Sequence, residues 1–252
     1  SVIAEPWDLA IGITPFNHPL NMLVHKVAPA IAAGTAMVIK PSEKTPLTAL
    51  KFGEILIECG LPKNLLNIVT GIDSKKIVDK LVTNPKIDIV SFTGGVNTGK
   101  AIARTMVNNG NELKKYMPEL GGNAAFVVMD DCNVDEAAKI ALGAFANSGQ
   151  RCTAIRKILL HHAVADAFMK KFVEMTSRIN CGDPFDVKTD MGTVISVEQA
   201  KLIERRVNLA VEEVARVMIG NQREGALYPP TIVDEVDPKS ELVVEETFGP
   251  VA

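Results

Sequence analysis

The chain has 252 residues and a net charge of -3, and 47% of its residues are hydrophobic while 23% are charged. These values are typical of a globular protein with one large domain or two moderate ones, and they exclude a disordered chain. The small net charge and the absence of a Lys/Arg block predict no nucleic-acid partner and no membrane partner, so a small-molecule partner is expected.

The cysteines indicate the compartment. No Cys-x-x-Cys pair occurs, and no histidine is spaced to complete a zinc site, so neither a disulfide scaffold nor a bound metal is predicted. Reduced cysteines fit a cytoplasmic protein. The longest apolar run, residues 27–39, is interrupted by Pro29 and Gly34 and is shorter than the roughly 20 residues of a membrane span.

The first half of the chain alternates short β-branched runs with amphipathic stretches. We expect strands at residues 9–14, 36–40, 66–70 and 87–92, and helices at 18–33, 47–59, 74–83 and 97–108. Such βα units join parallel strands through right-handed crossovers, which predicts a doubly wound α/β sheet of Rossmann type. Residues 114–122 are expected to be a connecting segment, with a domain boundary near Gly121-Gly122.

The second half is also predicted to be α/β. We expect strands at 124–129 and 157–160, and helices at 134–145, 164–177 and 196–217. The chain begins at Ser1 without an initiator Met and stops soon after Pro250 without a polar tail. We therefore expect it to be the central part of a longer protein, with the second domain incomplete.

Residues 147–154, Asn-Ser-Gly-Gln-Arg-Cys-Thr-Ala, place Cys152 in polar surroundings after an apolar helix. Gly149 allows the segment to turn. Because the thiolate is the nucleophilic form of cysteine, the neighbouring Arg151 favours a reactive thiol at Cys152. The alternative is a free cysteine that packs as a small buried hydrophobe.

Residues 94–100, Gly-Gly-Val-Asn-Thr-Gly-Lys, follow an apolar strand and open a helix. They resemble a P-loop, but Ala101 lacks the hydroxyl that would hold magnesium in a nucleotide hydrolase. The other interpretation is a dinucleotide pyrophosphate site, where glycines allow close approach and the helix N-terminus supplies N–H groups. We favour the dinucleotide, although an ordinary glycine-rich turn would look similar.

The segment Lys40-Pro41-Ser42-Glu43 follows a predicted strand, and the carboxyl ends of parallel strands face the ligand crevice. Glu43 is able to accept hydrogen bonds from ribose hydroxyls and would repel a 2′-phosphate. The segment therefore favours NAD over NADP. Alternatively, Lys40 and Glu43 are solvated loop charges.

Two further side chains are candidates for catalysis. Glu119 lies between Pro118 and Leu120 in uncharged sequence, so we expect it to be partly desolvated, with a pKa suited to a general base. A structural carboxylate is the alternative. Asn17 precedes a predicted helix, where its amide is suited either to capping or to donating to an oxyanion.

Taken together, six segments resemble the ordered motifs of the NAD(P)-dependent aldehyde dehydrogenase superfamily. The segments are Ile13-Thr14-Pro15-Phe16-Asn17, Lys40-Pro41-Ser42-Glu43, Phe92-Thr93-Gly94, Glu119-Leu120-Gly121-Gly122, Gly149-Gln150-Arg151-Cys152 and Glu245-Glu246-Thr247-Phe248-Gly249-Pro250. The sequence departs from the pattern twice, because Gly95 stands where most members carry Ser and Phe16 replaces a frequent Trp.

The resemblance implies an aldehyde dehydrogenase fold that is incomplete at both ends. Residues 1–8 would be a remnant of the oligomerisation element, residues 9–121 part of the NAD-binding domain, and residues 122–252 part of the catalytic domain. A homodimer or homotetramer is expected.

The resemblance also implies the roles of the site residues. Cys152 would be the nucleophile, Glu119 the water-activating base and Asn17 the oxyanion donor. The cofactor would contact Ile13, Thr14, Phe16, Lys40, Ser42, Glu43, Gly71, Phe92, Thr93, Gly94, Gly95, Thr98, Leu120, Glu246 and Phe248.

Within the family, Asn17-His18-Pro19 and residues 148–154 resemble the phosphonoacetaldehyde dehydrogenases. In that group the residues matching His18 and Arg151 face the phosphonate. A fork of N–H donors suits this anionic group. The alternatives are that His18 only packs and that Arg151 acts only on the thiolate.

The predicted reaction is NAD-dependent oxidation of a short anionic aldehyde to its carboxylic acid through a cysteine thioester. Other substrates remain open, among them lactaldehyde, succinate semialdehyde and glyceraldehyde 3-phosphate. A P-loop nucleotide-binding domain and an inactive fragment are the alternatives of another class. A CoA-acylating enzyme is disfavoured, because it would not need Glu119.

Overall fold

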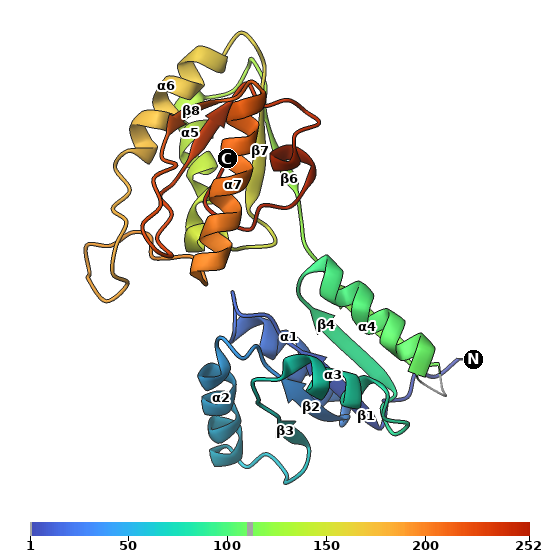
Figure 1. The fold of residues 1–252 in the computed structure, drawn as a ribbon. Helices are drawn as coiled ribbons and strands as arrows, with labels where there is room; N and C mark the ends of the chain where they lie inside the picture. The colour runs from blue at the N-terminus through green and yellow to red at the C-terminus, as the bar shows by residue number, and fades with distance from the viewer. Residues whose placement is uncertain (1, 110–112) are drawn as a thin grey trace. The chain divides into compact units, whose positions relative to one another are not determined.

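The structure is a computed structural model that describes residues 2–109 and 113–252. The chain divides into two compact units, Ser1–Gly121 and Gly122–Ala252 (Figure 1). Ser1, which belongs to the predicted oligomerisation remnant, lies outside the described residues.

The first unit is built on a parallel sheet of five strands in the order β3-β2-β1-β4-β5. This order confirms the predicted doubly wound α/β sheet. The strands are β1 (Leu9–Ile13), β2 (Ala36–Lys40), β3 (Leu66–Ile68), β4 (Ile89–Thr93) and β5 (Lys115–Glu119). The helices are α1 (Asn21–Ala33), α2 (Pro46–Glu58), α3 (Ser74–Val82) and α4 (Val96–Asn109).

Both faces of this sheet are covered by helices (Figure 1). On one face Ala10 of β1 packs with Leu23 and Val27 of α1, and on the other face Ile11 packs with Val82 of α3 and Ile102 of α4. The alternation along β1 follows from the two-residue period of a strand. Each fully buried Leu, Ile or Val contributes about 1.5–3 kcal/mol, so these two cores hold the edge of the sheet on which the site is built.

The segment 114–122, predicted to be a connection, contains the edge strand β5, so this prediction was wrong. β5 pairs in parallel with β4 from Ile89↔Lys115 to Thr93↔Glu119. Its residues are mostly exposed and include Pro118, which only an edge strand tolerates. The sequence therefore lacks the apolar run by which the inner strands are recognised.

The second unit contains two small sheets. β6 (Ala124–Val128) and β7 (Ile155–Leu160) are parallel, and β8 (Arg216–Ile219) and β9 (Ile232–Asp234) are antiparallel. Its helices are α5 (Val134–Ala141), α6 (Ala165–Thr176), α7 (Val197–Glu213) and the short α8 (Glu241–Val244). Two 3₁₀ turns, η1 (Leu142–Ala144) and η2 (Ala146–Gly149), follow α5.

Two predicted helices of this unit are shorter than expected. The helix predicted at 134–145 ends at Ala141 and continues as η1 and η2, where Asn147 and Ser148 adopt left-handed backbone angles. The helix predicted at 196–217 ends at Glu213, because the apolar and β-branched run beyond it forms β8.

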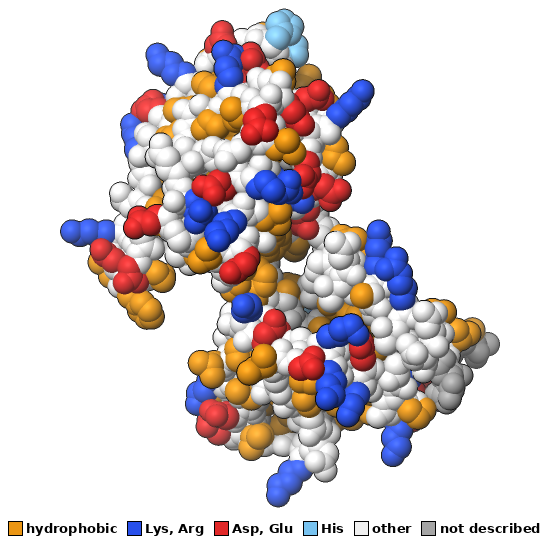
Figure 2. Space-filling view, in the orientation of Figure 1, with side chains coloured by type: hydrophobic (Ala, Val, Ile, Leu, Met, Phe, Trp, Pro, Cys, Tyr) orange, Lys and Arg blue, Asp and Glu red, His pale blue; other side chains and the backbone are white. Residues whose placement is uncertain are grey.

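Charges of both signs are interspersed over the face of each unit drawn in Figure 2. Within the described residues, none of the helices is long and apolar enough to span a membrane.

Candidate functional site

The predicted site residues of the first unit gather at the carboxyl ends of the parallel strands. Ile13 is in register with Lys40 on β2 and with Phe92 on β4, and Thr93 is in register with Glu119 on β5. This is the edge at which open α/β sheets bind ligands, next to the switch in strand order between β1 and β4. The structure therefore brings together residues from four separate sequence motifs.

Lys40 and Glu43 form a hydrogen-bonded cluster with Ser74, the first residue of α3. The buried Lys40 Nζ donates to Glu43 Oε2 at 3.2 Å and to Ser74 Oγ at 2.5 Å, and Ser74 Oγ donates to Glu43 Oε2 at 2.5 Å. Partial burial disfavours ionised Glu43, but the hydrogen bonds from Ser74, the backbone and Lys40 outweigh burial and lower the pKa of Glu43. An ionised acceptor beside an ammonium donor is suited to a pair of ribose hydroxyls. Ser74 carried no sequence signal, because it is 31 residues from Glu43 in the chain.

The turn from β4 into α4 leaves the backbone open at Gly95. Gly95 is exposed and a Cβ added to it would meet no atom within 4 Å, so a ligand has open access to the backbone at the start of α4. By contrast, a Cβ on Gly99 would lie 2.6 Å from Leu120 Cδ2. Gly95 thus allows a ligand to approach the backbone, whereas Gly99 allows α4 to pack against Leu120. The residues present fit a dinucleotide.

The other predicted cofactor residues of this unit lie around the same edge. Thr14 N–H donates to Lys40 O at 3.2 Å, the Phe16 carbonyl accepts from Thr45 Oγ1 at 3.4 Å, and Ser42 Oγ accepts from Lys44 N–H at 3.2 Å. Gly71 follows β3 at a close approach of Ile77, and Thr98 is exposed on the first turn of α4.

Lys26 is a buried cation at this edge that the sequence analysis missed. Its Nζ donates to Ser91 Oγ at 2.9 Å and to Thr93 Oγ1 at 2.8 Å. Burial lowers the pKa of Lys26 to about 8, and the nearby Glu119 carboxylate only partly offsets this. Gly12 leaves room for the lysine stem, since a Cβ there would lie 3.1 Å from Lys26 Cδ. A lysine on the apolar face of the helix, between Leu23 and Val27, was the available signal.

Glu119 differs from its prediction in two respects. The side chain is exposed, not partly desolvated, because β5 is an edge strand. Its surroundings also include the charge of Lys26, which comes from α1 and could not be read from the local sequence.

Asn17 and His18 are half-buried in the turn that connects β1 to α1. The residue at the N-cap of α1 is Leu20, so Asn17 does not cap this helix. The His18 carbonyl accepts the Met22 N–H at 3.0 Å.

In the second unit, Cys152 is exposed and lies in the turn between η2 and β7. The alternative of a buried structural cysteine is therefore wrong. Glycines bring two segments onto this turn: a Cβ on Gly149, which has φ +66°, would lie 2.0 Å from Gly249 O, and a Cβ on Gly122 would lie 2.3 Å from Cys152 O. The thiol is therefore accessible while its backbone is enclosed.

Arg151 is half-buried beside this cysteine. Its Nη2 donates a long hydrogen bond of 3.5 Å to Thr153 Oγ1, and its buried Nε has no hydrogen-bond partner among the described residues. No described carboxylate forms an ion pair with it. A guanidinium in this state retains its capacity to bind an anion.

The 245–250 loop carries the other predicted cofactor residues, Glu246 and Phe248. Glu246 Oε1 accepts the Gly122 N–H at 3.0 Å, and its carbonyl accepts Arg206 Nη1 at 2.6 Å. The Phe248 carbonyl accepts Gln199 Nε2 at 3.0 Å. α7 therefore holds the backbone of this loop through two of its side chains.

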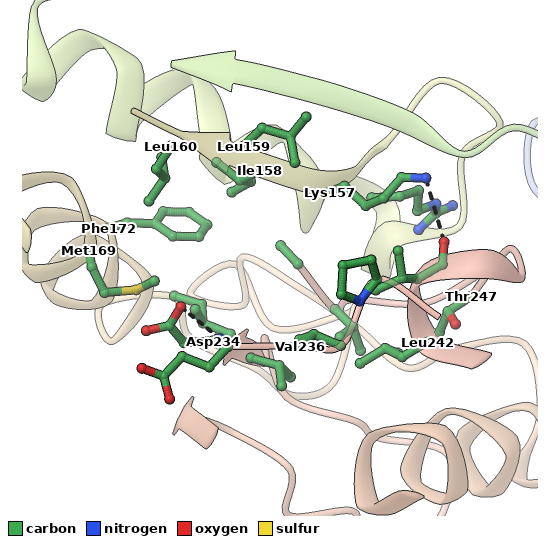
Figure 3. Close-up of a pocket in the computed structure, with 18 of the residues that line it drawn as sticks. Lys157, Ile158, Leu159, Leu160, Met169, Phe172, Asp234, Val236, Leu242 and Thr247 are labelled. Atoms are coloured by element: carbon green, nitrogen blue, oxygen red, sulfur yellow. Dashed lines mark hydrogen bonds between the residues drawn. The ribbon is translucent and has the colours of Figure 1, made fainter. Parts of the chain in front are cut away.

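The second unit contains a largely apolar cavity of about 240 Å³ (Figure 3), and Arg156 and Thr247 are among its lining residues. Its walls come from β7, α6, β9 and α8, and Phe172, Met169 and Leu160 point into it. Cys152, Arg151, Glu246 and Phe248 are not among its lining residues. The described residues also include no cluster of three or more His, Cys, Asp or Glu side chains that could hold a metal ion.

The family model for aldehyde dehydrogenases matches residues 1–252, the whole chain. The chain belongs to the aldehyde dehydrogenase family. Among curated members, it is 39% identical over 98% of its length to aspartate-semialdehyde dehydrogenase 1 of Pseudomonas canavaninivorans. It is 38% identical over the same share to 3-sulfolactaldehyde dehydrogenase of Priestia aryabhattai. It covers 51% of each of these relatives.

Solved structures of the family share the fold. Succinate-semialdehyde dehydrogenase from Burkholderia pseudomallei matches with a TM-score of 0.95 at 34% identity, covering 99% of this chain and 52% of that one. Betaine aldehyde dehydrogenase from Staphylococcus aureus, solved with NAD+, matches with a TM-score of 0.92 at 36% identity, covering 98% and 50%. The chain thus spans about half the length of the family members it matches.

Proposed function

We propose that this chain supplies the central, catalytic part of an enzyme that oxidises an aldehyde to a carboxylic acid with NAD. The Cys152 thiolate adds to the aldehyde carbon, and the Asn17 amide and the Cys152 N–H donate to the resulting oxyanion. NAD supplies the hydride acceptor when bound. Glu119 then takes a proton from the water that hydrolyses the thioester, which releases the acid and regenerates the thiol.

The observation that carries this proposal is the exposed thiol of Cys152, in a turn whose backbone is enclosed by Gly122 and Gly149. A nucleophile needs access for its substrate and a fixed backbone for the oxyanion donor. Family membership supports the same assignment, because the match to the family model includes this turn.

The choice of NAD over NADP is supported by Glu43. Its carboxylate is kept ionised by Ser74 and Lys40, and an ionised carboxylate at a ribose site repels a 2′-phosphate. Family structures solved with NAD+ and with NAP both match this chain, so the choice between the two cofactors rests on Glu43.

We further propose a short anionic substrate of the phosphonoacetaldehyde kind. The half-buried guanidinium of Arg151, which lacks a described carboxylate partner, is suited to bind an anion next to the reacting aldehyde. His18, in the turn after β1, is assigned to the same anion. Relatives named for sulfolactaldehyde and aspartate semialdehyde support an acidic substrate class.

The test is a panel of aldehydes of equal length, with and without a phosphonate, sulfonate or carboxylate, assayed with NAD and the full-length protein to which we assign this chain. The anionic aldehydes should be preferred. Arg151→Leu should lower kcat/KM for them by about ten- to a hundredfold, since a charge-assisted hydrogen bond contributes roughly 1.5–3 kcal/mol.

The neutral aldehydes should lose less. Equal losses for both kinds of substrate would show that Arg151 serves the thiolate and would contradict the anionic assignment. Arg178→Met is the control, because Arg178 pairs with Glu174 on the exposed face of α6.

We also propose that the whole protein is a cytoplasmic homo-oligomer, either a dimer or a tetramer. Size-exclusion chromatography with light scattering on the full-length protein tests the oligomeric state, and cell fractionation tests the location.

A further inference from the structure

Arg156 lies on β7, four residues after Cys152, and no part of the reaction described above uses it. It is only 8% exposed. Around it, Ile155 is in register with Ala124 and Lys157 with Ala125, so β7 contains one residue more than β6 at this point. Arg156 is the extra residue of a β-bulge, a feature that redirects a side chain and is often found beside active sites.

The bulge directs the guanidinium to two backbone segments. Arg156 Nη2 donates to the Arg151 carbonyl at 2.8 Å, in the turn of residues 150–153, which we call the nucleophile turn. Arg156 Nη1 donates to the Gly249 carbonyl at 3.1 Å, in the 245–250 loop. One side chain thus joins the peptide before Cys152 to the loop that carries Glu246 and Phe248.

A third contact fixes the plane of the guanidinium. Arg156 Cζ lies 5.4 Å from the centre of the Phe248 ring, within the range of a cation–π contact. Burial lowers the pKa of Arg156, while Glu246 and Cys152 oppose this by favouring its charged form. An ammonium could not hold both carbonyls and the ring face at once, because only the guanidinium has a planar fork of donors.

We propose that Arg156 is a positioning residue that holds the nucleophile turn and the 245–250 loop in a fixed relation within the second unit. The inference rests on the proposed function, because we assign the nicotinamide end of NAD to the 245–250 loop. Arg156 would hold Cys152 in a fixed position relative to that loop. Arg156 itself contacts neither reacting atom.

The test compares Arg156→Met, Arg156→Lys and the control Arg178→Met in the full-length protein. The first readout is the rate at which iodoacetamide alkylates Cys152 without cofactor, and the second is the Kd for NAD. Arg156→Met should weaken NAD binding about ten- to a hundredfold and change the alkylation rate several-fold. Arg156→Lys should retain part of the NAD affinity and of the wild-type alkylation rate. The control Arg178→Met should change neither quantity.

Two results would overturn the proposal: both readouts within twofold of wild type in Arg156→Met, or full function in Arg156→Lys, which would show that the fork is not needed. If Arg156→Met does not fold by circular dichroism, Arg156→Lys decides alone, and it must then lose NAD affinity while its unfolding temperature stays near wild type. The alkylation readout needs neither NAD nor turnover. It therefore separates failure of this inference from failure of the proposed function, which would appear as a wild-type protein that neither binds NAD nor oxidises an aldehyde.

Discussion

Lys26 shows most clearly how one buried group ties the fold to the site. In the folded chain burial lowers its pKa from 10.5 to about 8. Between these two pH values the unfolded chain keeps the proton and the folded chain has lost it. Stability therefore rises as the pH increases from about 8 to 10.5, and below pH 8 the buried ammonium costs stability.

We expect urea unfolding of Lys26→Met and wild type to show this difference. The wild type should gain on the order of 1–3 kcal/mol relative to the variant between pH 8 and 10.5. Lys51→Met, on the exposed surface of α2, is the control and should follow the wild-type curve. If the free energy of unfolding depends on pH in the same way for wild type and Lys26→Met, then Lys26 is not desolvated.

Glu43 gives a second prediction for a single residue. If its carboxylate excludes the 2′-phosphate, Glu43→Gln should raise the ratio of kcat/KM for NADP to that for NAD about tenfold, because a repulsion of roughly 1–2 kcal/mol between nearby charges is removed. Glu54→Gln, at an exposed pair with Lys51, should leave the ratio unchanged. An unchanged ratio in Glu43→Gln would show that specificity is set elsewhere.

At the scale of elements, the turn after η2 depends on one glycine. Gly149 combines φ +66° with an approach of 2.0 Å between its would-be Cβ and Gly249 O. Gly149→Ala should therefore destabilise the protein by at least about 1–3 kcal/mol from backbone strain, with a further steric loss. Thermal unfolding measures this directly.

Gly143→Ala is the matched control for that experiment. Gly143 lies in η1, and a Cβ there meets no atom within 4 Å. This variant should change stability by less than about 1 kcal/mol. Similar behaviour of the two variants would contradict the assigned role of Gly149.

The elements also show what the sequence could and could not predict. The inner strands β1, β2 and β4 are buried apolar runs, so periodicity located them to within one or two residues. β5 carries no such run because its stability comes from pairing with β4. The helix predicted at 196–217 includes the first two residues of β8 because charged residues precede them. Site residues within continuous sequence motifs could be predicted. Ser74, Lys26 and Arg156 could not, because their partners are distant in the chain and, for Arg156, because a bulge sets the direction of the side chain.

At the scale of the whole molecule, the residues assigned to the reaction are divided between the two units. Asn17, Glu119 and the Lys40–Glu43–Ser74 cluster belong to the first, and Cys152, Arg151 and the 245–250 loop belong to the second. The proposed reaction therefore needs residues of both units. The division of the chain into a cofactor part and a catalytic part stays a prediction.

The central claim is that Cys152 is the nucleophile of an NAD-linked aldehyde oxidation. The most direct measurement is rapid mixing of the full-length protein with NAD and the preferred anionic aldehyde, followed by mass spectrometry of the peptide that contains Cys152. We predict a burst of about one NADH per active site and an acyl adduct on Cys152, which accumulates in Glu119→Gln because hydrolysis is slowed. Cys152→Ala should show neither. A retained NADH burst in Cys152→Ala, or an adduct on another residue, would contradict the claim.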